Sequence, residues 1–189
     1  MGQYYTPTIL KKNWKLSKNP VKFAIKTWDF ENGLKLMEHS YIGNSVMMAM
    51  EHLLANDYKG YNVVWCGDYA DEVSTNLVNI DLYSYACDFF GSKEYKEKLA
   101  TIPKDIPYYR YLVNYTKKEY CTLPEFKPNT WVMHPLSLLT ASGNGRGGSD
   151  YPFEDERIGR WAFDRIGVTN DTDELKGFKE IDGKFKCDF

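Results

Sequence analysis

The sequence contains few of the residues and segments that mark well-understood site chemistries. The three histidines, His39, His52 and His134, show no metal-ligand spacing, so we expect neither a zinc site nor any other metal centre. The four cysteines are widely spaced and include no Cys-x-x-Cys pair: Cys66, Cys87, Cys121 and Cys187. This distribution is typical of reduced thiols in a cytosol and argues against a disulfide framework.

Long apolar runs and excess positive charge are also missing. No run approaches the ~20 apolar residues that cross a bilayer, and residues 1–10 lack the charged and apolar regions of a signal peptide. The net charge is −2, which argues against nonspecific binding to duplex DNA, because that affinity comes from neutralised phosphates. We therefore expect a cytoplasmic protein with no membrane partner and no duplex nucleic acid partner.

What the chain does have is the composition of a folded domain that is rich in aromatic residues. Its 189 residues, 43% of them hydrophobic and 26% charged, predict one globular domain over 1–189. The 15 tyrosines and 5 tryptophans suit strands, interfaces and stacking surfaces. Exposed aromatic residues on a sheet would also allow a homo-oligomer, which the sequence does not show.

Local patterns predict an α+β fold with a mainly antiparallel sheet and two or three helices. Helical spacing of apolar residues predicts a helix over 46–56, and charged pairs four residues apart predict another over 92–100. Residues 76–90 are interpreted as helical, and 34–42 as either helix or strand. Strands are expected over 3–10, 21–30, 61–66, 131–141 (interrupted at Pro135) and 160–168, with hairpins at 108–123 and around Asp182-Gly183.

The most distinctive stretch is the glycine-rich loop within 140–153, TASGNGRGGSDYPF. Glycine allows close approach of a ligand to the backbone, and successive N–H groups in such a loop can form a nest for an anion. The candidate ligand-binding residues there are Gly143, Asn144, Gly145, Arg146, Gly147, Gly148, Asp150 and Tyr151. A tight structural turn explains the glycines equally well.

Two known phosphate-binding fingerprints fail at this loop. Gly143-x-Gly145-x-x-Gly148 has the dinucleotide spacing, but Ser149, Asp150 and Pro152 follow where a helix should begin. No Lys-Ser/Thr pair follows the last glycine, as a Walker A loop requires. We therefore expect no cofactor.

Arginine replaces lysine around the loop. Four of the five arginines lie between Arg146 and Arg165, whereas none of the nineteen lysines lies between Lys127 and Lys176. Arginine binds phosphate or carboxylate through a planar fork, so the pattern favours an anionic ligand. Arg157 and Arg165 have acidic neighbours in the sequence and are expected to pair with them, which leaves Arg146 as the strongest candidate.

Two further groups could carry chemistry. Glu38 and His39 offer an acid and a base and are our candidate catalytic residues, although adjacent side chains do not face each other on a helix or a strand. Asp68 and Tyr69 follow a predicted strand, where polar groups are often presented to a site. A satisfied core histidine and a solvated acidic turn are the simpler interpretations. No pattern identifies a reaction class.

Several stretches together resemble a family of uncharacterised proteins encoded by bacteriophages and prophages. They are MGQYY, NGLKLMEHSYIGN, VVWCGDYAD, NYTKKEY, HPLSLLTASGNGRGGSDY and GRWAFD, spread over most of the chain except 73–107. Ser149 stands where this family would have a further glycine, and Cys66 where it would have alanine. The resemblance implies a phage origin but no established activity.

Phage accessory proteins of this size often act against host immunity, so the resemblance implies a role in countering host immune signalling. The leading hypothesis is therefore a module that binds a small anionic, nucleotide-like ligand, with Trp65, Tyr69, Tyr151 or Trp161 stacking on its base. The alternatives are a hydrolase that cleaves such a ligand and a protein-binding inhibitor of a host defence factor.

Overall fold

The computed structural model describes residues 3–128, 131–143 and 155–185. Seven of the eight candidate residues of the glycine-rich loop lie outside these ranges: Asn144, Gly145, Arg146, Gly147, Gly148, Asp150 and Tyr151. Gly143 is the last described residue before them. The predictions made for these seven residues therefore stay predictions.

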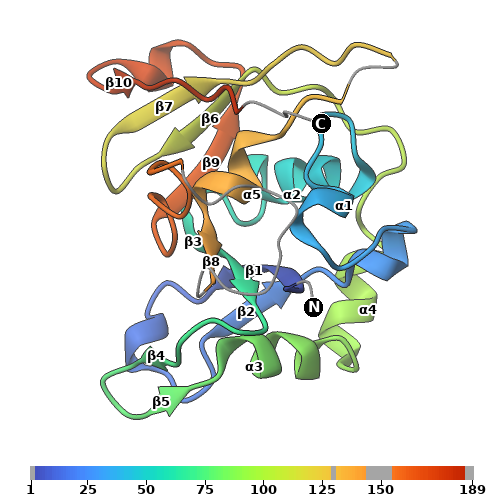
Figure 1. Cartoon of the computed structure of the whole chain (residues 1–189), viewed down its shortest axis with the longest axis vertical. Coiled ribbons are helices and arrows are strands. Elements are labelled where there is room, and N and C mark those ends of the chain that lie inside the picture. The colour runs from blue at the N-terminus through green and yellow to red at the C-terminus, as the bar shows by residue number, and fades with distance from the viewer. Residues whose placement is uncertain (1–2, 129–130, 144–154, 186–189) are drawn as a thin grey trace.

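The fold is α+β and is built on a mainly antiparallel sheet, as the sequence predicted (Figure 1). Seven strands lie in the order β10-β7-β6-β9-β3-β1-β2, and β8 also pairs with β3. Only the β10–β7 and β3–β8 pairs are parallel. The strands are β1 (Tyr5–Leu10), β2 (Val21–Ala24), β3 (Tyr61–Gly67), β6 (Tyr111–Asn114), β7 (Glu119–Thr122), β8 (Ala141–Ser142), β9 (Arg165–Thr169) and β10 (Lys179–Glu180); β4 (Val73–Ser74) and β5 (Asn79–Ile80) form a separate pair.

The three longer helices occur where the sequence predicted helical segments. They are α2 (Ser45–Ala55), α3 (Leu82–Phe89) and α4 (Lys93–Leu99). Asn44 begins α2 by accepting a hydrogen bond from the N–H of Val46, which satisfies one of the free donors of the first turn. The shorter elements are α1 (Leu36–His39), α5 (Pro135–Leu139) and the 3₁₀ turns η1 (Trp14–Leu16), η2 (Thr27–Phe30) and η3 (Asp173–Leu175).

Strand β3 is buried on both faces. Val63 and Trp65 belong to the main core cluster, which includes the apolar side of α2, whereas Val64 and Cys66 join a second cluster that includes residues of α3. This alternation follows from the two-residue period of a strand. It explains why YNVVWC contains so few charged residues.

Three predicted strand regions differ from the structure. Residues 135–139 form α5 instead of a strand, because Pro135 stands at the first helical position and the His134 side chain accepts a hydrogen bond from the N–H of Leu136. The second strand ends at Ala24 and is followed by η2, and the strand expected from 160 begins only at Arg165.

The expected hairpin at Asp182-Gly183 is also absent from the described residues. Strand β10 pairs in parallel with β7, and no strand is assigned within 181–185. None of the helices in 3–128, 131–143 and 155–185 has the length and hydrophobicity needed to cross a membrane.

Candidate functional site

Three of the described candidate residues, Glu38, Asp68 and Gly143, lie in one corner of the fold, where β3 and β8 end and β1 begins. Asp68 Oδ1 accepts a hydrogen bond from the N–H of Tyr4 at 3.0 Å, and Tyr4 in turn pairs with Lys35 across a β-bridge. The N–H of Lys35 donates to Glu38 Oε2 at 2.9 Å. Glu38 and Asp68 are thus tied to the same short backbone ladder, and both carboxylates already accept a backbone hydrogen bond.

His39 lies inside the core. Its side chain has no exposed surface, Nδ1 lies 3.1 Å from the carbonyl oxygen of Gly33, and Nε2 accepts the indole N–H of Trp65 at 3.0 Å. This pattern assigns the ring proton to Nδ1. Burial lowers the pKa of His39 to about 4, against a smaller opposite effect of the Gly33 hydrogen bond. Neither nitrogen is open to a substrate, so the geometry describes a neutral structural histidine.

The two tryptophans of the predicted site are fully buried as well. Trp65 and Trp161 have no exposed surface, and the indole N–H of Trp161 donates to Glu119 Oε2 at 2.9 Å. Neither ring offers a face to a ligand, which argues against the stacking role expected of them. Tyr69, by contrast, is 44% exposed.

Gly143 has a packing explanation. A Cβ atom at this position would lie 2.6 Å from the Tyr5 hydroxyl and 2.7 Å from Gln3 Oε1, which is closer than real Cβ atoms approach other heavy atoms. Both side chains are fully buried. A larger residue would therefore force Tyr5 or Gln3 to shift, which gives this glycine a packing role whether or not a ligand binds.

The arginines outside the glycine-rich loop divide into two kinds. Arg157 forms ion pairs with Asp155 at 2.6 Å and with Asp182 at 3.3 Å, so the pairing expected from the sequence is present. Arg165, for which the same was expected, forms no ion pair within the described residues; its Nε donates to the carbonyl oxygen of Gly60 at 3.0 Å.

Arg165 lines a surface groove of about 700 Å³ between η1 and the start of β9. We call it the Lys–Arg groove. Three of its residues are cationic, Lys12, Lys15 and Arg165, and two are large aromatics, Trp14 and Phe163. The others are Asn13, Leu16, Asn62, Thr116 and Asp164.

The positive charges that line the groove are not neutralised by acidic side chains of the described residues. Lys12 lies over the ring of Tyr61 at 5.0 Å and Lys15 over that of Trp14 at 5.5 Å, and neither forms an ion pair in the described part of the chain. The carboxylate of Asp164 is paired with residues outside the groove, because its Oδ2 accepts hydrogen bonds from Asn114 at 2.8 Å and from the Lys117 ammonium.

Phe163 holds an unusual backbone conformation at this groove. Its φ angle is 66°, in the left-handed region where a bulky side chain is disfavoured. Strand β3 holds the turn on both sides: the Phe163 N–H donates to the carbonyl oxygen of Val63 at 2.9 Å, and the Asn62 amide donates to the Phe163 carbonyl at 2.6 Å. The ring stacks on Trp14 with centroids 5.5 Å apart. Such strain is often found at functional sites.

Sequence reasoning missed most of this groove. No residue of 11–20, between the strands predicted over 3–10 and 21–30, was among the candidates, although three lysines surround one tryptophan in KKNWK. That cluster was the available signal. The proximity of residues 12–16 to 163–165 depends on the pairing of β1, β3 and β9, which no local pattern specifies.

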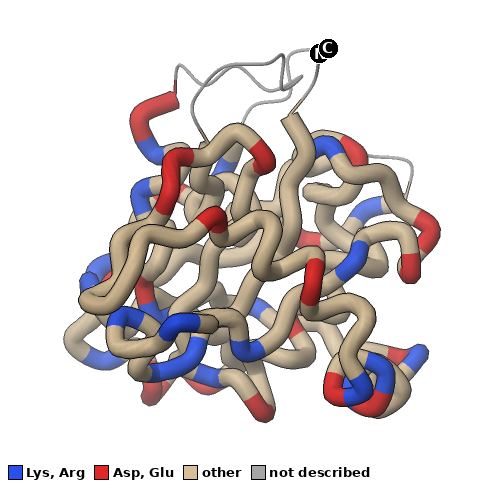
Figure 2. The backbone as a smooth tube through the Cα atoms, turned by 90° about the horizontal axis from the view of Figure 1, so that it is seen from below, with Lys and Arg blue, Asp and Glu red and all other residues tan. Residues whose placement is uncertain are grey.

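The groove is a local feature of the charge distribution. Figure 2 shows basic and acidic positions interspersed along the tube, without separate basic and acidic faces.

Among the described residues, no group of three or more histidine, cysteine or acidic side chains is placed to hold a metal ion. No family model, curated protein or solved structure matches the chain.

Proposed function

We propose that the protein binds a small anionic, nucleotide-like ligand in the Lys–Arg groove. The observation that carries this proposal is the set of three cations, Lys12, Lys15 and Arg165, which line one groove without an acidic partner among the described residues. Ammonium and guanidinium groups make charge-assisted hydrogen bonds to phosphate. Phe163, which is half-buried at the groove and stacks on Trp14, favours a ligand with a flat ring system.

Binding is better supported than cleavage. No histidine or cysteine lines the groove, and its one acidic residue, Asp164, is held by Lys117 and Asn114. A general base must reach the proton that it abstracts, and His39 is fully buried and is not among the residues that line the groove. The hydrolase hypothesis would regain support if ligand were consumed under turnover conditions.

The resemblance to phage proteins gives this proposal a biological setting. A phage protein that captures a nucleotide signal of host immunity would need cations for the phosphates and no catalytic group. A protein-binding inhibitor is the second candidate, because Trp28 and Trp131 are 63% and 72% exposed, and tryptophan is enriched at protein interfaces. Pull-down from host lysate with Trp28→Ser and Trp131→Ser variants would distinguish the two.

The direct test is a thermal-shift and calorimetry panel of mononucleotides, cyclic dinucleotides and the corresponding uncharged nucleosides. A ligand at 100 times its Kd adds about 2.7 kcal/mol to the free energy of unfolding. We expect nucleotides but not nucleosides to bind, and Lys12→Ala, Lys15→Ala and Arg165→Ala each to weaken binding about tenfold. Lys96→Ala, which removes an exposed lysine of α4 outside the groove, is the matched control.

Two outcomes would overturn the proposal. One is a panel in which no nucleotide stabilises the protein. The other is a bound nucleotide whose affinity is the same in the three groove variants and in Lys96→Ala. Arg146→Ala should be included, because a loss of binding in that variant alone would assign the ligand to the glycine-rich loop instead.

A further inference from the structure

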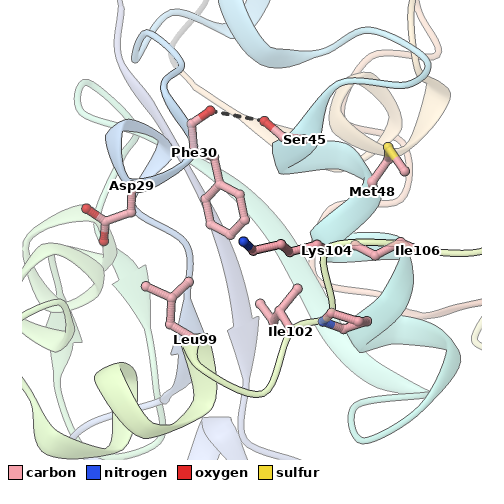
Figure 3. A pocket seen from close by; sticks show the side chains of 9 residues that line it. Asp29, Phe30, Ser45, Met48, Leu99, Ile102, Lys104 and Ile106 are labelled. Atoms are coloured by element: carbon pink, nitrogen blue, oxygen red, sulfur yellow. Dashed lines mark hydrogen bonds between the residues drawn. The ribbon is translucent and has the colours of Figure 1, made fainter.

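A second cavity, of about 360 Å³, lies between η2, the first turn of α2 and the segment that follows α4. Its walls are mainly apolar and include Phe30, Met48, Leu99, Ile102 and Ile106 (Figure 3). It shares no residue with the Lys–Arg groove. Ligand cavities typically measure about 300–1,000 Å³ and combine an apolar lining with a few polar groups, so this one suits a compact molecule.

One cation, Lys104, is among the residues that line this cavity. The residue is exposed, and its side chain points toward Phe30 (Figure 3). Lys104 forms no ion pair within residues 3–128, 131–143 and 155–185. An ammonium group at the edge of an apolar cavity can donate a charge-assisted hydrogen bond to a carboxylate whose apolar body occupies the cavity.

The acidic residue that lines the cavity is turned to another partner. Asp29 also lines the cavity, but its Oδ2 accepts the hydroxyl of Tyr95 at 2.6 Å. Figure 3 shows the Asp29 carboxylate pointing away from Phe30 and Lys104. The Ser45 hydroxyl is likewise committed, because it donates to the carbonyl oxygen of Phe30 at 3.0 Å.

We infer that this cavity binds a small monocarboxylate with an aromatic or branched aliphatic body. The Lys104 ammonium holds the carboxylate, and Phe30, Met48, Ile102 and Ile106 surround the apolar body. A single ammonium matches one negative charge, whereas a phosphate dianion would carry a second charge that no other cation among the lining residues meets. The chemistry therefore differs from that of the Lys–Arg groove.

Phenylacetate is a suitable probe, with phenylacetamide as its neutral isostere and phenethylamine as its cationic counterpart. Binding to the full chain is followed by calorimetry and by the methyl NMR signals of Met48, Ile102 and Ile106. We expect saturable binding of phenylacetate in the millimolar range or tighter, and binding of phenylacetamide about tenfold weaker. Phenethylamine should bind more weakly than either.

Variants at Lys104 distinguish the contribution of its charge to binding from that of the shape of the cavity. Lys104→Gln should make phenylacetate bind no better than phenylacetamide, and Lys104→Glu should favour phenethylamine. Lys96→Gln, on the neighbouring helix, should change nothing. The Lys12→Ala variant of the groove should bind phenylacetate like the unmodified protein, so the two sites can fail independently.

The inference is overturned if phenylacetate does not shift these methyl signals at millimolar concentration. It is equally overturned if phenylacetamide or phenethylamine binds as well as phenylacetate, or if Lys104→Gln keeps the preference for the carboxylate.

Discussion

Trp65 donates its indole N–H to Nε2 of His39, 3.0 Å away, inside the main core. The two residues come from β3 and α1, 26 positions apart in the chain. Their rings also lie nearly parallel, with centroids 6.5 Å apart and 22° between the planes. The contact joins α1 to the central sheet and makes the neutral form of His39 part of the folded structure.

This contact predicts a pH dependence of stability. The pKa of His39 is about 4 in the folded protein and about 6.5 in an unfolded chain. Since the unfolded state binds the proton first, the stabilisation is complete above about pH 6.5 and is lost as the pH falls towards 4. The loss should reach about 3 kcal/mol. Urea unfolding at pH 7 and pH 4.5 measures it.

The matched variants are His39→Gln and His52→Gln. His39→Gln should lower stability at pH 7 but show a smaller decrease between pH 7 and pH 4.5. His52 is half-buried on α2, and its replacement should leave the decrease unchanged. An identical pH dependence in His39→Gln and the unmodified protein would contradict the assignment.

The buried hydrogen bond between His134 and Glu51 predicts how much stability is lost when Glu51 is replaced. His134 Nδ1 accepts the N–H of Leu136 at 3.0 Å, so Nε2 carries the proton and donates to Glu51 Oε1 at 2.6 Å. Glu51→Gln keeps an acceptor and should cost about 1 kcal/mol. Glu51→Leu and Glu51→Ala leave a buried donor unpaired and should cost about 2–3 kcal/mol or more. Denaturant unfolding checks this order, and equal losses in all three variants would speak against the hydrogen bond.

The success of the sequence-based predictions depended on how local their signals were. Helix α2 has a capping Asn44 and apolar residues at helical spacing, and β3 has a short run of strand-forming residues. Both were predicted within one or two residues. The strand predicted over 131–141 was wrong, because residues 135–139 form a helix that is capped by His134. The ring of His134 is held by Glu51, 83 positions away.

The Lys–Arg groove also depends on contacts between residues that are far apart in the sequence. Arg165 was expected to pair with an acidic residue close in sequence, such as Asp164. Asp164 instead binds Asn114 and Lys117, 50 and 47 positions away. Arg165 is thereby left to line the Lys–Arg groove. The arginine pattern of the sequence predicted an anionic ligand, but only the structure shows that Arg165 forms no ion pair within the described residues.

The turn between β6 and β7 should gain stability from one substitution. Lys118 is exposed and has a φ of 52°, a conformation that disfavours residues with a Cβ atom. Lys118→Gly removes this cost, and after the entropy cost of glycine we expect a gain of about 0.5 kcal/mol. The measurement is a higher urea midpoint with an unchanged m value.

The adjacent lysine provides the control for this turn. Lys117 pairs with Asp164, and its φ is not positive, so Lys117→Gly should destabilise the protein. If both glycine variants lowered stability equally, relief of backbone strain at Lys118 would be disproved.

The last prediction concerns Gly143, where the described residues meet the glycine-rich loop. In Gly143→Ala the new Cβ would lie 2.6 Å from the Tyr5 hydroxyl, and such overpacking costs about 1–3 kcal/mol. Tyr5→Phe removes this hydroxyl, so the alanine substitution should cost less in the Tyr5→Phe background, which a double-mutant cycle detects as coupling.

Gly91→Ala is the control for the alanine substitution itself. The nearest atom to a Cβ at Gly91 is the carbonyl oxygen of Asp88, at 4.0 Å, so this change should be neutral or slightly stabilising. If Gly143→Ala were as harmless as Gly91→Ala, the packing explanation would fail and a role in ligand binding would again be the better account of Gly143. If it destabilises the protein without any ligand present, this glycine is kept for the fold, and Gly143 no longer counts among the candidate ligand-binding residues of the loop.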